Sequence, residues 1–69
     1  MTVGERIKQL REERGWRPSY LAMELGCSQS AIYYYEAGRN KRYIKILILA
    51  CCYVFGITRE EFMKGVDRD

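Results

Sequence analysis

The sequence predicts an all-α fold, a compact bundle of five short helices in a single domain that spans residues 1–69. Over most of the chain, apolar residues recur at the three- and four-residue spacing of a helix face. Glycines and hydroxyl residues stand where such helices would end and begin. A chain of 69 residues has little interior, so we expect either an efficient helical core or a partner chain.

The first helix is expected over residues 4–14 and is followed by Gly15. Its apolar stripe consists of Val3, Ile7 and Leu10. Its charged positions are expected to form surface salt bridges; they are Arg6, Lys8, Arg11, Glu12 and Glu13. The second helix is expected from Pro18 or Ser19 to Leu25, because the missing N–H of a proline costs nothing in a first turn. Trp16, between the two helices, is interpreted as a core residue rather than a base-stacking one.

A third helix is expected over residues 28–37, with Ser28 as its N-cap and Gly38 as its end. On a helical wheel its apolar side carries Ala31, Ile32 and Tyr35. The opposite side carries Gln29, Ser30, Tyr33, Tyr34 and Ala37. Only Gly26 and Cys27 separate this helix from the second one, and two short helices joined by so short a turn are typical of a helix-turn-helix motif.

The fourth helix is expected over residues 44–55 and is apolar on nearly every side. Because a helix of this kind must be covered on every side, we expect a second copy of the chain to cover it. The predicted homodimer interface lies within residues 44–64 and includes Ile46, Cys52, Tyr53, Phe55 and Phe62. Thr58 and Glu61 predict a capping box for a short fifth helix, and residues 66–69 are expected to be a tail.

Charge and composition narrow the class of function. The formal net charge is +3, and the basic excess lies in residues 28–45, which suits a polyanionic partner. The longest apolar run, residues 46–57, is shorter than the roughly 20 residues that span a bilayer, and no signal segment is evident, so we expect a cytoplasmic protein. With no histidine and no C-x-x-C spacing, no metal or other cofactor is expected. The cysteines lack an activating partner, so no enzyme is expected.

Three stretches carry a resemblance to a known family. They are residues 4–16 (GERIKQLREERGW), 21–32 (LAMELGCSQSAI) and 35–38 (YEAG). With these spacings the chain resembles, over nearly its whole length, the Xre family of lambda repressor-like and Cro-like helix-turn-helix proteins. The resemblance implies a bundle of five helices and a dimeric transcriptional regulator. It also implies that the second helix of the motif enters the major groove of DNA.

The resemblance assigns roles to individual residues. Gln29, Ser30 and Tyr34 match the base-contacting positions. Arg11 and Glu36 match a partly buried ion pair between the first helix and the recognition helix. The expected contacts to the DNA backbone are Arg17, Ser19, Tyr33, Arg39, Asn40, Lys41, Arg42 and Lys45.

The chain departs from the family pattern at two places. The family commonly opens the first helix of the motif with Thr-Gln, where the glutamine holds a phosphate, but this chain has Arg17 and Pro18. That contact is therefore lost, or it is replaced by Arg17 or Ser19. The usual Pro-Ser start of the fourth helix is replaced by Arg42 and Tyr43, after a connection longer than the family's usual one.

We interpret the chain as a sequence-specific regulator of transcription, a repressor in the first instance, that binds a palindromic double-stranded operator as a homodimer. No membrane partner and no small-molecule effector are expected. The alternative is a protein-interaction module on the same scaffold, of the antitoxin or antirepressor type, because tyrosines on the third helix suit a protein interface as well as a groove.

Overall fold

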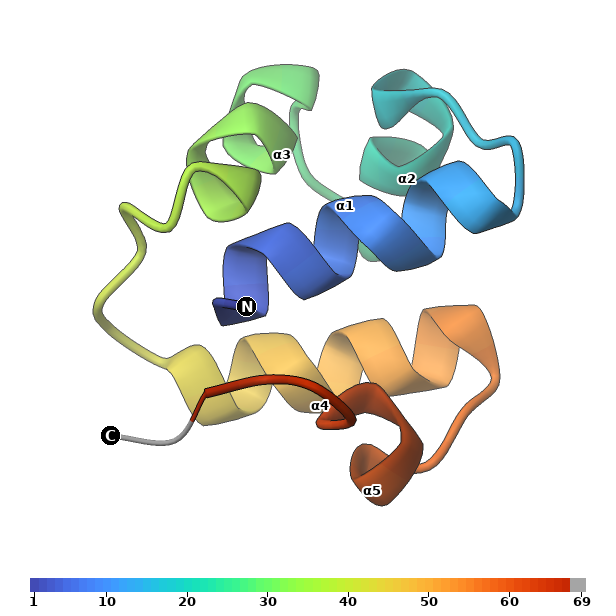
Figure 1. Ribbon diagram of the computed structural model, residues 1–69. Coiled ribbons are helices and arrows are strands. Elements are labelled where there is room, and N and C mark those ends of the chain that lie inside the picture. The colour runs from blue at the N-terminus through green and yellow to red at the C-terminus, as the bar shows by residue number, and fades with distance from the viewer. Residues whose placement is uncertain (68–69) are drawn as a thin grey trace.

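The computed structural model describes residues 1–67 and places five helices and no strand within them, which confirms the all-α prediction. The helices are α1 (Val3–Glu13), α2 (Pro18–Leu25), α3 (Gln29–Glu36), α4 (Ile44–Phe55) and α5 (Arg59–Phe62). Figure 1 shows α1 crossing the middle of the molecule, with α2 and α3 on one side of it and α4 and α5 on the other.

Local capping explains where the helices begin. Thr2 and Glu5 form a full capping box, so α1 begins one residue before the expected start at Gly4. The hydroxyl of Ser28 accepts from the N–H of Ala31 at 3.1 Å and caps α3 as expected. At α5 the hydroxyl of Thr58 accepts from the N–H of Glu61 at 3.1 Å, which is one half of the expected capping box.

The hydrophobic core lies between the helices, where α2 contacts both α3 and α4 and where α1 packs against α3 and α4. Its buried side chains come from all five helices and include Ile7, Leu10, Leu21, Ala22, Ile32, Ile48, Cys51, Cys52, Phe55 and Phe62. The indole of Trp16 packs against this core and stacks on Phe55, with ring centroids 5.5 Å apart. Trp16 is thus a packing residue, as the sequence suggested.

Arg6 was expected on the charged surface of α1, but it is only 8% exposed. Its Nε donates to the carbonyl of Phe62 at 2.8 Å, and its Nη2 donates to the carbonyl of Glu61 at the same distance. Both carbonyls lie at the end of α5, where a cation is favoured. The helical wheel missed this contact because α5 is remote in sequence.

The fourth helix is covered on one side by its own chain. Cys52, Phe55 and Phe62, which were predicted to face a second copy, are 8%, 6% and 0% exposed within the single chain. These three side chains belong to the hydrophobic core of the single chain, so they are not available to a second copy. Of the five predicted interface residues, Ile46 and Tyr53 remain at the surface, with 63% and 90% exposure.

The chain ends lie close together among the described residues. The N–H of Asp67 donates to the carbonyl of Met1 at 2.8 Å, and Val66 is 9% exposed. Residues 66 and 67, expected to belong to a tail, therefore pack on the bundle, while residues 68–69 lie outside the described part of the chain. Within residues 1–67, no helix has the length and apolar character needed to cross a membrane.

Candidate nucleic-acid interface

The turn between α2 and α3 fixes the direction of α3. Gly26 ends α2 in the left-handed conformation, with φ of 74°, a value that glycine adopts without steric cost. The next N–H, of Cys27, donates back to the carbonyl of Ala22 at 2.9 Å. Because Ser28 then caps α3 at once, only a short turn joins the two helices, as the sequence indicated.

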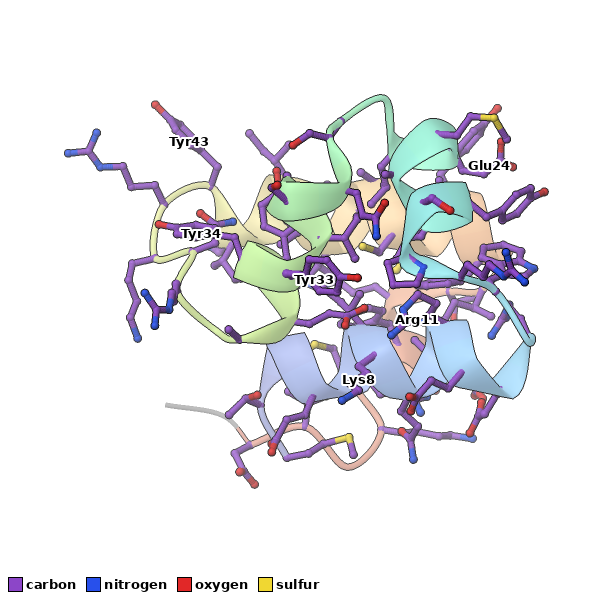
Figure 2. The ribbon with its side chains drawn as sticks, turned by 90° about the horizontal axis from the view of Figure 1, so that it is seen from above. Lys8, Arg11, Glu24, Tyr33, Tyr34 and Tyr43 are labelled. Atoms are coloured by element: carbon purple, nitrogen blue, oxygen red, sulfur yellow. The ribbon has the colours of Figure 1, made fainter. Side chains whose placement is uncertain are left out.

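The two faces of α3 differ as predicted from the helical wheel. Ile32 is fully buried and Tyr35 packs against the core. Tyr33 and Tyr34 are 53% and 47% exposed. The other exposed positions of this face are Ser28, Gln29, Ser30 and Ala37. In Figure 2, Tyr34 points away from the bundle, while Tyr33 points toward the side where Arg11 lies.

An ion pair holds the end of α3 against α1. Arg11 Nε donates to Glu36 Oε2 at 2.7 Å, and the two side chains are 9% and 8% exposed. The hydrogen bond with Glu36 raises the pKa of Arg11, against the opposing effect of burial. Arg11 Nη1 also donates to the carbonyl of Trp16 at 2.8 Å. One guanidinium therefore connects α1, α3 and the connection before α2.

A glycine allows α1 and α3 to approach closely. Gly4 is buried, and a Cβ atom at this position would stand 2.5 Å from the carbonyl oxygen of Tyr35 and 2.6 Å from that of Glu36. No side chain larger than hydrogen fits between these two backbones. The sequence shows a glycine here, but nothing local marks it as a helix contact.

Basic and polar residues lie on both sides of α3. Arg39, Lys41, Arg42 and Lys45 are exposed, and Asn40 is half-buried, in the connection to α4 and at its first turn. Arg17 and Ser19 are exposed at the start of α2. In Figure 1, the start of α2 and the connection from α3 to α4 lie at opposite ends of the molecule. Such an arrangement could contact DNA phosphates on both sides of a groove that holds α3.

The start of α4 is locally strained. Tyr43 is its N-cap and has a φ of 55°, the one non-glycine residue with positive φ within residues 1–67. A tyrosine in the left-handed region costs about 1 kcal/mol. Arg42 and Tyr43 stand where the sequence departs from the Pro-Ser start expected from the resemblance, so this departure coincides with unusual backbone geometry.

A hydrogen bond between two side chains of α3 was not anticipated. The amide nitrogen Nε2 of Gln29 donates to the hydroxyl of Tyr33 at 3.0 Å, on the exposed face of the helix. The i, i+4 spacing of these residues was the available signal, because side chains four apart lie over one another on a helix.

Comparison with known proteins agrees with this geometry. A family model described as a helix-turn-helix domain matches residues 2–62, which is most of the chain. Domains of this kind are typically non-catalytic modules that bind DNA. No curated protein matches the chain.

Proposed function

Because this chain belongs to the helix-turn-helix domain family, we propose that it is a sequence-specific double-stranded DNA-binding regulator of transcription. The observation that carries the proposal is the division of α3: Ile32 is fully buried, while the opposite face exposes an amide, a hydroxyl and phenols. In helix-turn-helix proteins the second helix of the motif lies in the major groove.

Base contacts are assigned to Gln29, Ser30 and Tyr34. All three are exposed near one another on α3, and the first two stand in its first turn, where base contacts concentrate. A glutamine amide can pair with N6 and N7 of adenine, and a good pair of this type is worth about 1 to 3 kcal/mol of discrimination. Tyr34 can donate a hydrogen bond or contact a thymine methyl group.

Backbone contacts are assigned to the exposed basic residues on either side of α3. The logarithm of the affinity falls linearly with the logarithm of the salt concentration, and each neutralised phosphate makes this slope steeper by about 0.9. If the contacts come from Arg17, Arg39, Lys41, Arg42 and Lys45, affinity should fall steeply between low and physiological salt. Ser19 and Asn40 would add uncharged contacts, which change this slope little.

We further propose that the protein acts as a homodimer on a palindromic operator and represses transcription by occupying it. Ile46, Leu49 and Tyr53 form an exposed stripe along α4, on the side that the chain does not cover. The molecule measures 28 × 23 × 17 Å, so two copies side by side can place their α3 helices about one DNA turn, roughly 34 Å, apart.

Selection of bound duplexes from a random pool tests the proposal. We expect a two-fold symmetric consensus, with half-sites about 10 base pairs apart between centres. Recovery of no preferred sequence by the wild-type protein would contradict sequence-specific binding. A reporter gene with the selected sequence across its promoter then tests repression.

A salt titration separates DNA binding from the alternative, a protein-interaction module. Affinity for the selected duplex should fall with rising salt, and Lys41→Ala with Arg42→Ala should reduce the slope by about 2. Glu24→Ala, an exposed change on α2, is the control and should leave the slope unchanged. Duplex binding that is absent, or independent of salt, would favour a protein partner for the tyrosines of α3.

A further inference from the structure

We propose that Tyr33 is a positioning residue that orients the amide of Gln29 for adenine. The inference rests on the proposed function, because it concerns how α3 selects a base. It replaces the expectation that Tyr33 contacts the DNA backbone. The observation that carries it is the hydrogen bond from Gln29 Nε2 to the hydroxyl of Tyr33, at 3.0 Å on the exposed face of α3.

The hydrogen bond decides which groups of the amide remain for DNA. A glutamine amide has two N–H donors and one carbonyl acceptor. Tyr33 accepts from one N–H, so one donor and the carbonyl oxygen remain. Adenine presents the acceptor N7 and the donor N6 in the major groove, and these complement the two remaining groups.

The opposite orientation of the amide would select a different base. If the tyrosine hydroxyl donated to Oε1 of Gln29, both N–H groups would face the groove. Guanine presents two acceptors there, N7 and O6, and would then be preferred. The contact with the hydroxyl of Tyr33 therefore distinguishes two possible specificities, and the arrangement in which Nε2 of Gln29 faces the hydroxyl corresponds to adenine.

The backbone gives this contact a fixed geometry. Gln29 is the first residue of α3 and Tyr33 lies one turn later, so their side chains come from neighbouring positions on one face. Between them, on the opposite face, Ile32 is fully buried and holds that turn against the core. The tyrosine ring has few rotamers, so it offers a better-defined acceptor than a long flexible side chain would.

The test uses four versions of the full chain: wild type, Gln29→Ala, Tyr33→Phe and the double variant. Selection with wild type and Gln29→Ala first identifies the base pair that depends on Gln29. We expect adenine there, and Tyr33→Phe should lower the preference for adenine over guanine by about fivefold to tenfold. In the Gln29→Ala background, Tyr33→Phe should change nothing further at that base pair, because the two residues act together.

Two controls separate this role from a structural one. Tyr20→Phe removes a hydroxyl from an exposed tyrosine of α2 that has no assigned DNA contact, and it should leave the preference at the Gln29 base pair unchanged. The urea midpoint of Tyr33→Phe should equal that of wild type, because both side chains are exposed.

Several outcomes would overturn the inference without touching the proposed function. One is that Tyr33→Phe keeps the wild-type preference for adenine over guanine. Another is guanine at the Gln29 position. A third is an equal loss of affinity for all sequences that persists in the Gln29→Ala background, which would make Tyr33 a backbone contact. In this experiment, a wild type with no sequence preference would instead contradict the proposed function itself.

Discussion

The guanidinium of Arg11 donates hydrogen bonds to both carboxylate oxygens of Glu36 and to the carbonyl of Trp16. With side-chain exposures of 9% and 8%, the Arg11–Glu36 pair has little water to compensate for a lost partner. Its position at the last residue of α3 means that it holds one end of the proposed recognition helix. In the proposed function, the pair would hold α3 in place without contacting DNA itself.

Glu36→Gln is expected to lower the free energy of unfolding by about 3 kcal/mol, because it leaves the charge of Arg11 buried without a counter-charge. Urea unfolding followed by circular dichroism measures the change. Glu24→Gln, which alters an exposed carboxylate of α2, should unfold at the wild-type midpoint. An unchanged midpoint for Glu36→Gln would show that the pair is not structural.

Cys51 is a fully buried thiol in the middle of α4. Burial raises its pKa from 9.0 to about 12, and the neighbouring thiols of Cys52 and Cys27 add to the shift. At a pH between 9.0 and about 12, Cys51 therefore keeps its proton in the folded chain but loses it in the unfolded chain. This contribution to stability is complete below pH 9 and is lost as the pH rises toward 12.

We therefore expect the free energy of unfolding to fall more steeply with pH in wild type than in Cys51→Ala above pH 9, by up to about 1.4 kcal/mol per pH unit. Urea midpoints between pH 8 and pH 10.5, in the presence of a reductant, measure both slopes. Comparing the two proteins isolates the contribution of the Cys51 thiol from every other effect of pH on stability. Parallel slopes would contradict the prediction.

The helices depend on each other at a few points of close contact. At Gly4 the backbone of α1 meets the carbonyl end of α3, with no space for a Cβ atom. At Arg6 the side chain of α1 occupies the carbonyl end of α5. Because α1 makes both contacts, it sets the position of α3 on one side of the molecule and of α5 on the other (Figure 1).

Gly4→Ala tests the contact between α1 and α3. Helix propensity alone predicts that alanine would stabilise α1 by about 1 kcal/mol. The overlap with two backbone oxygens should reverse the sign, and we expect a loss of about 1 to 3 kcal/mol in thermal or urea unfolding. Lys8→Ala, an exposed change in the same helix, should be nearly neutral. A more stable Gly4→Ala would mean that the helices separate at little cost.

For the molecule as a whole, the proposed function needs two separate surfaces, the exposed stripe of α4 and the basic residues beside α3. The stripe of Ile46, Leu49 and Tyr53 would bring two copies together, and the basic residues would hold the pair on DNA. A symmetric dimer uses the same surface of both copies, so a single charged substitution acts twice.

Leu49→Lys should convert the protein from dimer to monomer in sedimentation equilibrium at micromolar concentration, because Leu49 is 57% exposed in the middle of the stripe. Met23→Lys is a matched control: its side chain is 66% exposed but lies on α2, so the dimer should persist. A wild-type protein that sediments only as a monomer would remove the dimer from the proposal.

The sequence alone determined the positions of the helices and the division of α3 into two faces. Both depend on interactions within one or two turns: caps at Ser28 and Thr58, and a periodic contrast between apolar and polar residues. The ion pair of Arg11 and Glu36, which the family resemblance implied, is also present in the structure.

Only the tertiary structure decided which side of α4 is buried, because nearly every residue of that helix is apolar and the wheel offers no contrast. Cys52 and Phe55 are therefore in the core, while Tyr53 between them is 90% exposed. The burial of Arg6 and the close backbone contact at Gly4 have the same kind of cause, because their partners are on α5 and α3, far along the chain. Contacts between remote segments leave no local pattern in a sequence, so they become visible only when the helices are packed.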